Sequence, residues 1–510
     1  MRRRQFVAGA ATLAAAPVIA LPGRPAVAGA RQAGSSSLSG IGERLSGLIP
    51  ELAGQLGSPG YVAGIYQDGS EWMYAHGVRN LNTGDPMTTD TAWLPGSITK
   101  VLTTTLLLKY VEAGRIDLEA PVARYLPDLK LAEPGAAERI RVKQLVNHTN
   151  GIDADTLMPA REFGPNAVQS YIDALARAGT LFAPDELLHY TNPGFTIAGR
   201  IIETLSGKSF NRTLEEEIFA PIGMDRSVTS ATQAILHRTA LGAYPGAGGG
   251  MQAASLFMLP VSAAPAGATP IVTVGDLIAF GRTHLADGVA PNGKRLLSAE
   301  LCRAMRTPTF DLKTPNAPPV GLGWFLPPIG GTTAWWHGGG SPGGTAGLTV
   351  FPEYDLAIAS FGTGPGSSPM HDKLVNTVLR EHLGLTVRPP FSRTATTLPM
   401  NHYAGDYEAF ESRLEVRAGK GADELEVTSH FLPSSEEQER VLKLYAGPAS
   451  KAAPTLTYAA IHDNLFAPSG LPEDYFSGVW GRMALLSFHQ VGGNPARRYA
   501  HTRFRALLKA

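Results

Sequence analysis

Two strand hairpins frame the larger part of this sequence, and a long stretch of helical pattern separates them. Residues 61–67 and 71–78 are strand-like and flank an Asp-Gly dipeptide, which favours a two-residue hairpin turn. Residues 345–351 and 356–361 form the second pair. This order predicts an α+β fold in which one sheet collects strands from both ends of the region, with helices packed around it.

Three helices are predicted between the hairpins. The first covers residues 102–111 and follows a Pro-Gly-Ser start at 95–97. The second has Asn192 as its N-cap, proline as its first helical residue and Gly207 just past its end. The third covers residues 275–285.

The pattern changes after residue 385. Residues 386–399 are predicted to be a linker between a domain at 29–385 and a small all-β domain at 400–510. No long helical pattern is evident beyond the linker, and the domain is expected to be a barrel. Its clearest strand predictions are residues 414–417, 425–428, 441–445 and 456–461.

Residues 1–28 have the three-part layout of an export signal. Arginines at positions 2–4 precede an alanine-rich apolar stretch, and Ala26-Val27-Ala28 offers a cleavage site. The Arg-Arg-x-Phe-Val pattern resembles a twin-arginine signal. Cleavage would leave 40 basic residues against 44 acidic ones, a charge of −4. We therefore expect a secreted or extracytoplasmic protein without a stable membrane anchor.

Composition excludes several classes of protein. The 510 residues carry 44 basic and 44 acidic side chains and no polybasic run, so we expect no nucleic-acid partner. The single cysteine, Cys302, rules out an intrachain disulfide and a cysteine-rich zinc site. We expect no metal and no organic cofactor, and the sequence leaves the oligomeric state open.

Ser97-Ile98-Thr99-Lys100 is the first candidate for chemistry. At the start of a helix, residues three apart share a face, so the lysine amine lies close to the serine hydroxyl. A desolvated lysine can accept the proton of that hydroxyl, and the helix N-terminus stabilises negative charge on it. The pattern predicts a nucleophilic Ser97 activated by Lys100.

Two further segments complete the candidate site. Tyr190-Thr191-Asn192 offers a phenol that can relay protons and an amide that can hold a substrate carbonyl. His337 is followed by three glycines, which allow close approach of a substrate to a strand. Residues 339–343 also match Gly-x-Ser-x-Gly around Ser341. A nucleophile elbow, however, needs a helix directly after its serine, and a strand follows here.

In this order, Ser97-x-x-Lys100, Tyr190-x-Asn192 and His337-Gly338-Gly339 resemble the motifs of the penicillin-recognising serine hydrolases. The class C β-lactamase, D,D-peptidase and esterase group is the most similar branch. Residues 145–152, 221–224 and 321–324 resemble further family segments. The resemblance covers about residues 40–385, and residues 403–407 are similar to the start of an appended lipocalin-like domain.

The resemblance implies a sheet flanked by helices, a helical subdomain and a role for each motif residue. Ser97 would be the acylated nucleophile, with Lys100 and Tyr190 sharing the acid and base roles. Asn192 would bind the substrate amide. The oxyanion hole would be the N–H groups of Ser97 and Gly340. His148 would be structural.

His337 and Gly338 depart from the family's Lys-Thr-Gly, where a lysine and a hydroxyl help to hold a substrate carboxylate. His337 either orients Tyr190 or the substrate as a neutral imidazole, or binds a carboxylate when protonated. We therefore predict weak hydrolysis of penicillins and better activity on esters or amides without a free carboxylate near the scissile bond.

Three functions follow as hypotheses. The first is an exported serine hydrolase that acts through an acyl-enzyme on a small-molecule or peptide substrate, as a D-amino-acid peptidase, carboxypeptidase or esterase. The second is a β-lactamase, or a relative that transfers the acyl group to an amine and so cyclises or transpeptidates peptides. The third is a non-catalytic peptidoglycan- or ligand-binding protein, which the intact Ser97, Lys100 and Tyr190 argue against.

Overall fold

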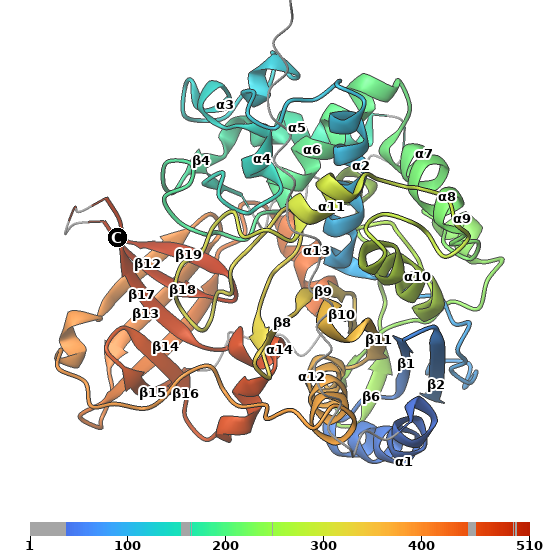
Figure 1. The fold of residues 1–510 in the computed structure, drawn as a ribbon. Coiled ribbons are helices and arrows are strands. Elements are labelled where there is room, and N and C mark those ends of the chain that lie inside the picture. Colours follow the sequence, from blue (N-terminus) through green and yellow to red (C-terminus); the bar gives the residue numbers. More distant parts are fainter. Residues whose placement is uncertain are drawn as a thin grey trace, which may run out of the picture.

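The computed structural model describes residues 37–154, 164, 166–246, 248–446, 455–492, 494 and 497–510. The predicted export signal at 1–28 lies outside these residues. A mixed helix–sheet part and a C-terminal barrel lie side by side (Figure 1). No helix in the described part of the chain combines the length and apolar character needed to cross a membrane.

One five-stranded antiparallel sheet forms the centre of the helix–sheet part, in the order β2-β1-β11-β10-β9. The first hairpin therefore pairs with the second through β1 and β11, which confirms that one sheet takes strands from both ends of the region. Asp68 and Gly69 have φ values of 48° and 83°, as the two-residue turn requires. The strands are β1 (Gly60–Gln67), β2 (Ser70–Gly77), β9 (Trp335–Ser341), β10 (Gly344–Phe351) and β11 (Leu356–Thr363).

Helices cover both faces of this sheet. On one face, α10 (Val274–Leu285) lies against β1, where Val274 and Ile278 contact the side of Gly64. On the other, α1 (Leu38–Leu56) and α12 (Ser367–Thr377) pack together below the sheet in Figure 1. This layering leaves β9 as the sheet edge that faces the barrel.

The helical part above the sheet is built around two buried helices, α2 (Thr99–Glu112) and α6 (Asn192–Ser206), which pack against each other (Figure 1). Eleven of the fourteen residues of α2 are buried, so the helix is enclosed on almost every side. The other helices are α3 (Ala136–Arg139), α4 (Val142–Leu145), α5 (Ala167–Ala174), α7 (Phe210–Leu214), α8 (Ala220–Ile222), α9 (Ala231–Ala234) and α11 (Ala299–Met305).

The start of α6 corrects one prediction. Asn192 is not the N-cap, because the hydroxyl of Thr191 accepts the hydrogen bond from the N–H of Gly194 at 3.0 Å. Asn192 is the first helical residue, and this frees its side-chain amide from the capping role. The end of the helix is as predicted, with Gly207 in the left-handed conformation.

The C-terminal region is a closed barrel of eight antiparallel strands, which confirms the predicted all-β barrel. The segment at 386–399, predicted as a linker, contains no helix or strand. The barrel strands are β12 (Gly405–Ala409), β13 (Ser412–Ala418), β14 (Glu424–Phe431), β15 (Leu456–His462), β16 (Leu465–Pro468), β17 (Leu486–Gln490), β18 (Arg498–Thr502) and β19 (Arg505–Lys509).

The strand predicted at 441–445 is wrong. These residues belong to α13 (Glu436–Ala446), a helix between β14 and β15. Ser435 caps it by accepting from the N–H of Gln438 at 3.1 Å, and Glu439 pairs with Lys443 one turn later. A short second helix, α14 (Val479–Arg482), precedes β17.

The barrel shares its apolar contacts with the helix–sheet part. Phe504, between β18 and β19, is buried with its ring 4.6 Å from that of Phe325. The hydroxyl of Tyr499 donates to the carbonyl of Leu181 at 2.8 Å. The two units therefore bury surface against each other close to the candidate site residues.

Candidate active site

Ser97 lies in a 3-10 turn, Gly96–Ile98, that leads directly into α2. Lys100 follows one turn later and is completely buried, whereas Ser97 is half-buried. The Lys100 Nζ donates to Ser97 Oγ at 3.1 Å, to Asn192 Oδ1 at 2.7 Å and to the carbonyl of Ala266 at 2.7 Å. The structure thus brings three of the predicted site residues into one hydrogen-bonded group.

Tyr190 is held against this group on the chain segment that precedes α6. Its ring centroid lies 4.8 Å from Lys100 Nζ and 4.5 Å from the ring of His148, which stacks on it at 21°. The guanidinium carbon of Arg505 lies 5.1 Å from the same centroid. A lysine of α2 and an arginine of the barrel are therefore both close to the Tyr190 ring.

His337 is a buried neutral imidazole. Its Nδ1 lies 2.7 Å from the carbonyl oxygen of Gly338, so Nδ1 carries the proton and donates it, and Nε2 is left as an acceptor. Among the described residues Nε2 has no hydrogen-bond partner. Burial, helped by the nearby Lys100 charge, lowers the pKa of His337 to about 3. This state favours the orienting role over carboxylate binding.

The glycines of β9 allow the strand to approach the turn that carries Ser97. A Cβ on Gly339 would lie 1.8 Å from the carbonyl oxygen of Pro95 and 2.8 Å from the backbone nitrogen of Ser97. A Cβ on Gly96 would lie 2.3 Å from the carbonyl oxygen of Gly340. Only glycine, without a side chain, fits at positions 96 and 339. This close approach places the peptide of Gly340 beside that of Ser97, as an oxyanion hole requires.

The C-terminal region supplies contacts that the sequence analysis did not anticipate. The position that a Cβ on Gly338 would take is 2.4 Å from the indole of Trp480. The corresponding position on Gly340 is 2.6 Å from the hydroxyl of Tyr445 on α13. Ser435 and Gln438 match the Ser-x-x-Gln pattern of a helix start, which could have revealed α13. No local sequence signal indicates that Trp480 lies against β9.

Trp480 is fixed by a buried carboxylate. Asp372 on α12 accepts the N–H groups of Trp480 at 3.3 Å and Gly481 at 2.9 Å, at the start of α14. Burial raises the pKa of Asp372 to about 7, against the lowering effect of these hydrogen bonds. Asp372 therefore links the helix–sheet part to the barrel side of the site.

Ser341 does not have the setting of a hydrolase nucleophile. It ends β9, and its hydroxyl donates to the carbonyl of Gly344 at 3.3 Å, at the start of β10. A nucleophile elbow needs a strand followed by a helix, and here two strands follow each other.

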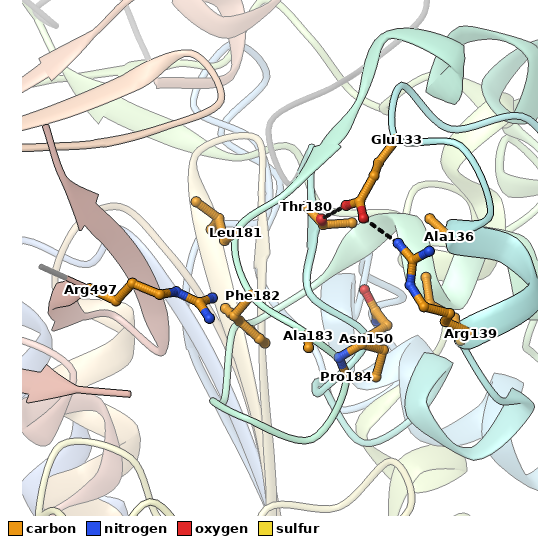
Figure 2. A pocket seen from close by; sticks show the side chains of 11 residues that line it. Glu133, Ala136, Arg139, Asn150, Thr180, Leu181, Phe182, Ala183, Pro184 and Arg497 are labelled. Atoms are coloured by element: carbon orange, nitrogen blue, oxygen red, sulfur yellow. Dashed lines mark hydrogen bonds and ion pairs between the residues drawn. The ribbon is translucent and has the colours of Figure 1, made fainter. Parts of the chain in front are cut away.

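A separate cavity of about 220 Å³ lies between α3 and the loop before β18 (Figure 2). None of the predicted site residues lines it. Figure 2 shows Glu133 held between Thr180 and Arg139, and Arg497 on the opposite wall is paired with Glu186 at 3.2 Å. The described residues also contain no cluster of three or more His, Cys, Asp or Glu side chains that could hold a metal ion.

Comparison with known proteins adds independent information. A family model described as Beta-lactamase matches residues 45–379. The chain is 33% identical over 357 residues to "Penicillin-binding protein 4" of Amycolatopsis lactamdurans, with 69% of this chain and 93% of that protein covered.

Two solved structures are similar to this one. "Crystal structure of SurE with D-Leu" covers 92% of this chain and 100% of its own, with a TM-score of 0.69 and 23% identity, which is a likeness of fold alone. The D-amino acid amidase of Ochrobactrum anthropi SV3, complexed with L-phenylalanine amide, is 26% identical with a TM-score of 0.58. That match covers 67% of this chain and 98% of the amidase.

Proposed function

The chain belongs to the beta-lactamase family and is a serine hydrolase, and on that premise we propose that it cleaves amide or ester bonds of D-amino-acid derivatives outside the cytoplasm, through an acyl-enzyme on Ser97. One observation carries the proposal. The buried amine of Lys100 touches both the Ser97 hydroxyl and the Asn192 amide, with the ring of Tyr190 alongside. A serine within hydrogen-bond reach of a proton acceptor is the arrangement that nucleophilic acyl transfer needs.

The chemistry follows from this arrangement. Ser97 Oγ attacks the substrate carbonyl while its proton passes to the Lys100–Tyr190 pair. The N–H groups of Ser97 and Gly340 stabilise the oxyanion. The pair then gives the proton to the leaving amine or alcohol, and an ester forms on Ser97. Attack of water on this ester, with its proton taken by the same pair and returned to Ser97, releases the acid.

The substrate class is supported by the similarity to a D-amino acid amidase and by the state of His337. A neutral imidazole and a glycine at 337–338 supply neither the charge nor the hydroxyl that would anchor a carboxylate. A hydrogen bond to a charged group contributes roughly 1.5–3 kcal/mol. We therefore propose that penicillins, which carry such a carboxylate, are poor substrates.

The test is intact-mass measurement after exposure to matched pairs of compounds. The panel contains D- and L-phenylalanine amides, the corresponding methyl esters, and benzylpenicillin. The proposal expects an adduct or turnover with the D-compounds, none with Ser97→Ala, and normal reaction with the control Ser341→Ala. An adduct mapped to Ser341, or no adduct and no turnover with any compound, would overturn it.

The fate of the acyl group is read in the same experiment. Added D-amino acid amides compete with water for the acyl-enzyme, and the masses of the products distinguish hydrolysis from transfer. We propose that water is the acceptor. A product that carries the added amine in preference to the free acid would replace this with the acyl-transferring function.

Export is part of the proposal and rests on the sequence of residues 1–28. Secreted protein should begin near Gly29, as N-terminal sequencing would show. Substitution of Arg3 and Arg4 by lysine should block export, because twin-arginine signals are recognised by that pair. Undiminished export of this variant would assign a general secretory route instead.

A further inference from the structure

The turn between β18 and β19 places barrel residues at Tyr190. Arg503 and Phe504 form this two-residue turn with φ values of 49° and 63°. Both are in the left-handed region, where residues other than glycine are strained. The turn would be easier to form with Asn-Gly.

The hairpin also fixes the backbone of the segment that carries Tyr190. The carbonyl of Phe504 accepts the N–H of Tyr190 at 2.7 Å. The N–H of Ala506 donates to His189 Nδ1 at 3.1 Å, and His501 Nε2 lies 3.1 Å from the carbonyl oxygen of Leu188. Three consecutive residues of the site segment are thus held by the barrel.

The charges that face the Tyr190 ring come from different elements. Two basic side chains lie near it, Lys100 on α2 and Arg505 on β19, with Nζ and Cζ at 4.8 Å and 5.1 Å from the ring centroid. The three nearby histidines are neutral. Burial, with the charges of Lys100 and Arg505 adding to it, lowers the pKa of His148 well below its usual value.

The other two histidines are neutral for reasons of their own. Burial lowers the pKa of His337 to about 3. His189 accepts a backbone N–H through Nδ1, so that nitrogen carries no proton. In members of the family with Lys-Thr-Gly, the position of His337 is occupied by a permanent cation, which this chain lacks there.

We propose that Arg505 is a positioning residue for proton transfer, whose guanidinium charge keeps the Lys100–Tyr190 pair ready to accept the proton of Ser97. The proposal rests on the proposed function and adds the barrel to its site. A neighbouring cation favours the form of any group that has lost a proton. The direction is therefore the same whether the lysine or the tyrosine takes the proton.

The test is the pH dependence of kcat/KM for an uncharged ester or amide, so that no substrate carboxylate can bind the guanidinium. The acidic side of the profile, where kcat/KM falls as the pH drops, reports the pKa of the proton-accepting pair. Removal of one positive charge about 5 Å away should move this fall to a higher pH by about one unit. Arg505→Gln should show this shift, and its kcat/KM should be about tenfold lower than that of the wild type at pH values below the pKa of the pair. Arg505→Lys should keep most of the wild-type profile.

Arg503→Gln is the matched control, since Arg503 lies on the same turn but is exposed. Its profile should coincide with that of the wild type. If Arg505→Gln raises KM without shifting the pH profile, or lowers activity equally at every pH, the inference is overturned. Neither result touches the proposed function, which fails only if wild-type protein forms no adduct on Ser97.

Discussion

Lys100 has a buried amino group, and three oxygen atoms within hydrogen-bond distance offset the cost of its desolvation. Burial of an unpaired charge would cost several kcal/mol, but Nζ reaches a serine hydroxyl, an amide oxygen and a backbone carbonyl. All three of these groups are neutral. The residue is thus placed to exchange a proton with Ser97 and with the adjacent Tyr190.

We expect Lys100 and Tyr190 to behave as one unit in mutant kinetics. Lys100→Ala and Tyr190→Phe should each lower kcat/KM at least a hundredfold, the size usual for a lost acid–base group. The double mutant should be little worse than the poorer single mutant, because either substitution alone already abolishes proton transfer by the pair. Losses that multiply in the double mutant would show that the two residues act separately.

His337 allows a prediction about pH. Its pKa of about 3, lowered by burial, means that the ring stays neutral throughout the range above about pH 4. Titration of His337 should therefore not change the ratio of kcat/KM for an acid substrate to kcat/KM for its matched ester between about pH 5 and 7.5. A ratio that rises for the acid below about pH 6.5 would show a protonated His337 binding the carboxylate.

At the scale of elements, the edge strand β9 lies between two units. One side of it approaches the Ser97 turn through Gly339, and the glycines on either side, Gly338 and Gly340, approach the indole of Trp480 and the phenol of Tyr445. These contacts come from α14 and α13, which belong to the C-terminal region. The glycines therefore serve both the approach to Ser97 and the contact with the barrel.

A paired substitution tests the contact of α13 with β9. Gly340→Ala places a Cβ 2.6 Å from the Tyr445 hydroxyl, whereas the next ring atom, Cζ, is 3.9 Å away. The single mutant should lose about tenfold or more in kcat/KM, because the strand or the helix must shift. Tyr445→Phe removes the clashing oxygen, so the double mutant should recover most of this loss relative to Gly340→Ala.

The control for this pair is Gly54→Ala, an exposed position on α1 where a Cβ meets nothing within 4 Å. Its activity should equal that of the wild type. If the double mutant is no better than Gly340→Ala, the loss comes from the backbone of β9 and α13 does not contact it in solution.

At the scale of the whole molecule, the barrel completes the apolar core of the site. Phe504 packs on Phe325 and on Trp336, whose rings lie 4.6 Å and 6.1 Å away. Tyr190 belongs to the same buried cluster. The barrel is therefore a structural part of the hydrolase, and its loss would uncover the segment that carries Tyr190.

The whole molecule should also be sensitive to mild acid. Burial lowers the pKa of His284, His337 and His371 to about 3 and that of His489 to about 4, against about 6.5 when unfolded. Between these values the unfolded chain binds protons that the folded chain cannot. The stability that these groups contribute is therefore complete above about pH 6.5 and falls as the pH drops.

Asp372 acts in the opposite direction. Its folded pKa of about 7 is above the unfolded value, so its contribution to stability is present at low pH and is lost as the pH rises through 7. Burial likewise raises the pKa of Glu203 and Asp276 and lowers that of His148 and His501. The histidines carry the larger shifts, so the free energy of unfolding should fall by about 1 kcal/mol or more per pH unit below about 6. Urea unfolding at several pH values, followed by tryptophan fluorescence, measures it. A free energy that stays constant from about pH 6.5 to 4.5 would contradict this.

The sequence by itself determined what depends on neighbours along the chain. The hairpin turn at Asp68-Gly69, the end of α6 at Gly207 and the Ser97–Lys100 spacing are local. The order of strand and helix patterns was enough to predict one sheet built from both ends. Tyr190, Asn192 and His337 were found through the resemblance of their motifs, and the structure brings them together. The helix α13 was missed because its short apolar run fits a strand as well as a helix.

Only the tertiary structure decided what depends on burial and on contacts between distant segments. His337 is neutral because the fold surrounds it and places Lys100 nearby. Asn192 accepts a hydrogen bond from Lys100, while Thr191 caps the helix. The approach of Arg505 to Tyr190 joins residues more than 300 positions apart, and no local pattern encodes such a distance. Desolvation and packing are properties of the assembled core, so the sequence could name the reacting groups but not the charges and side chains that surround them.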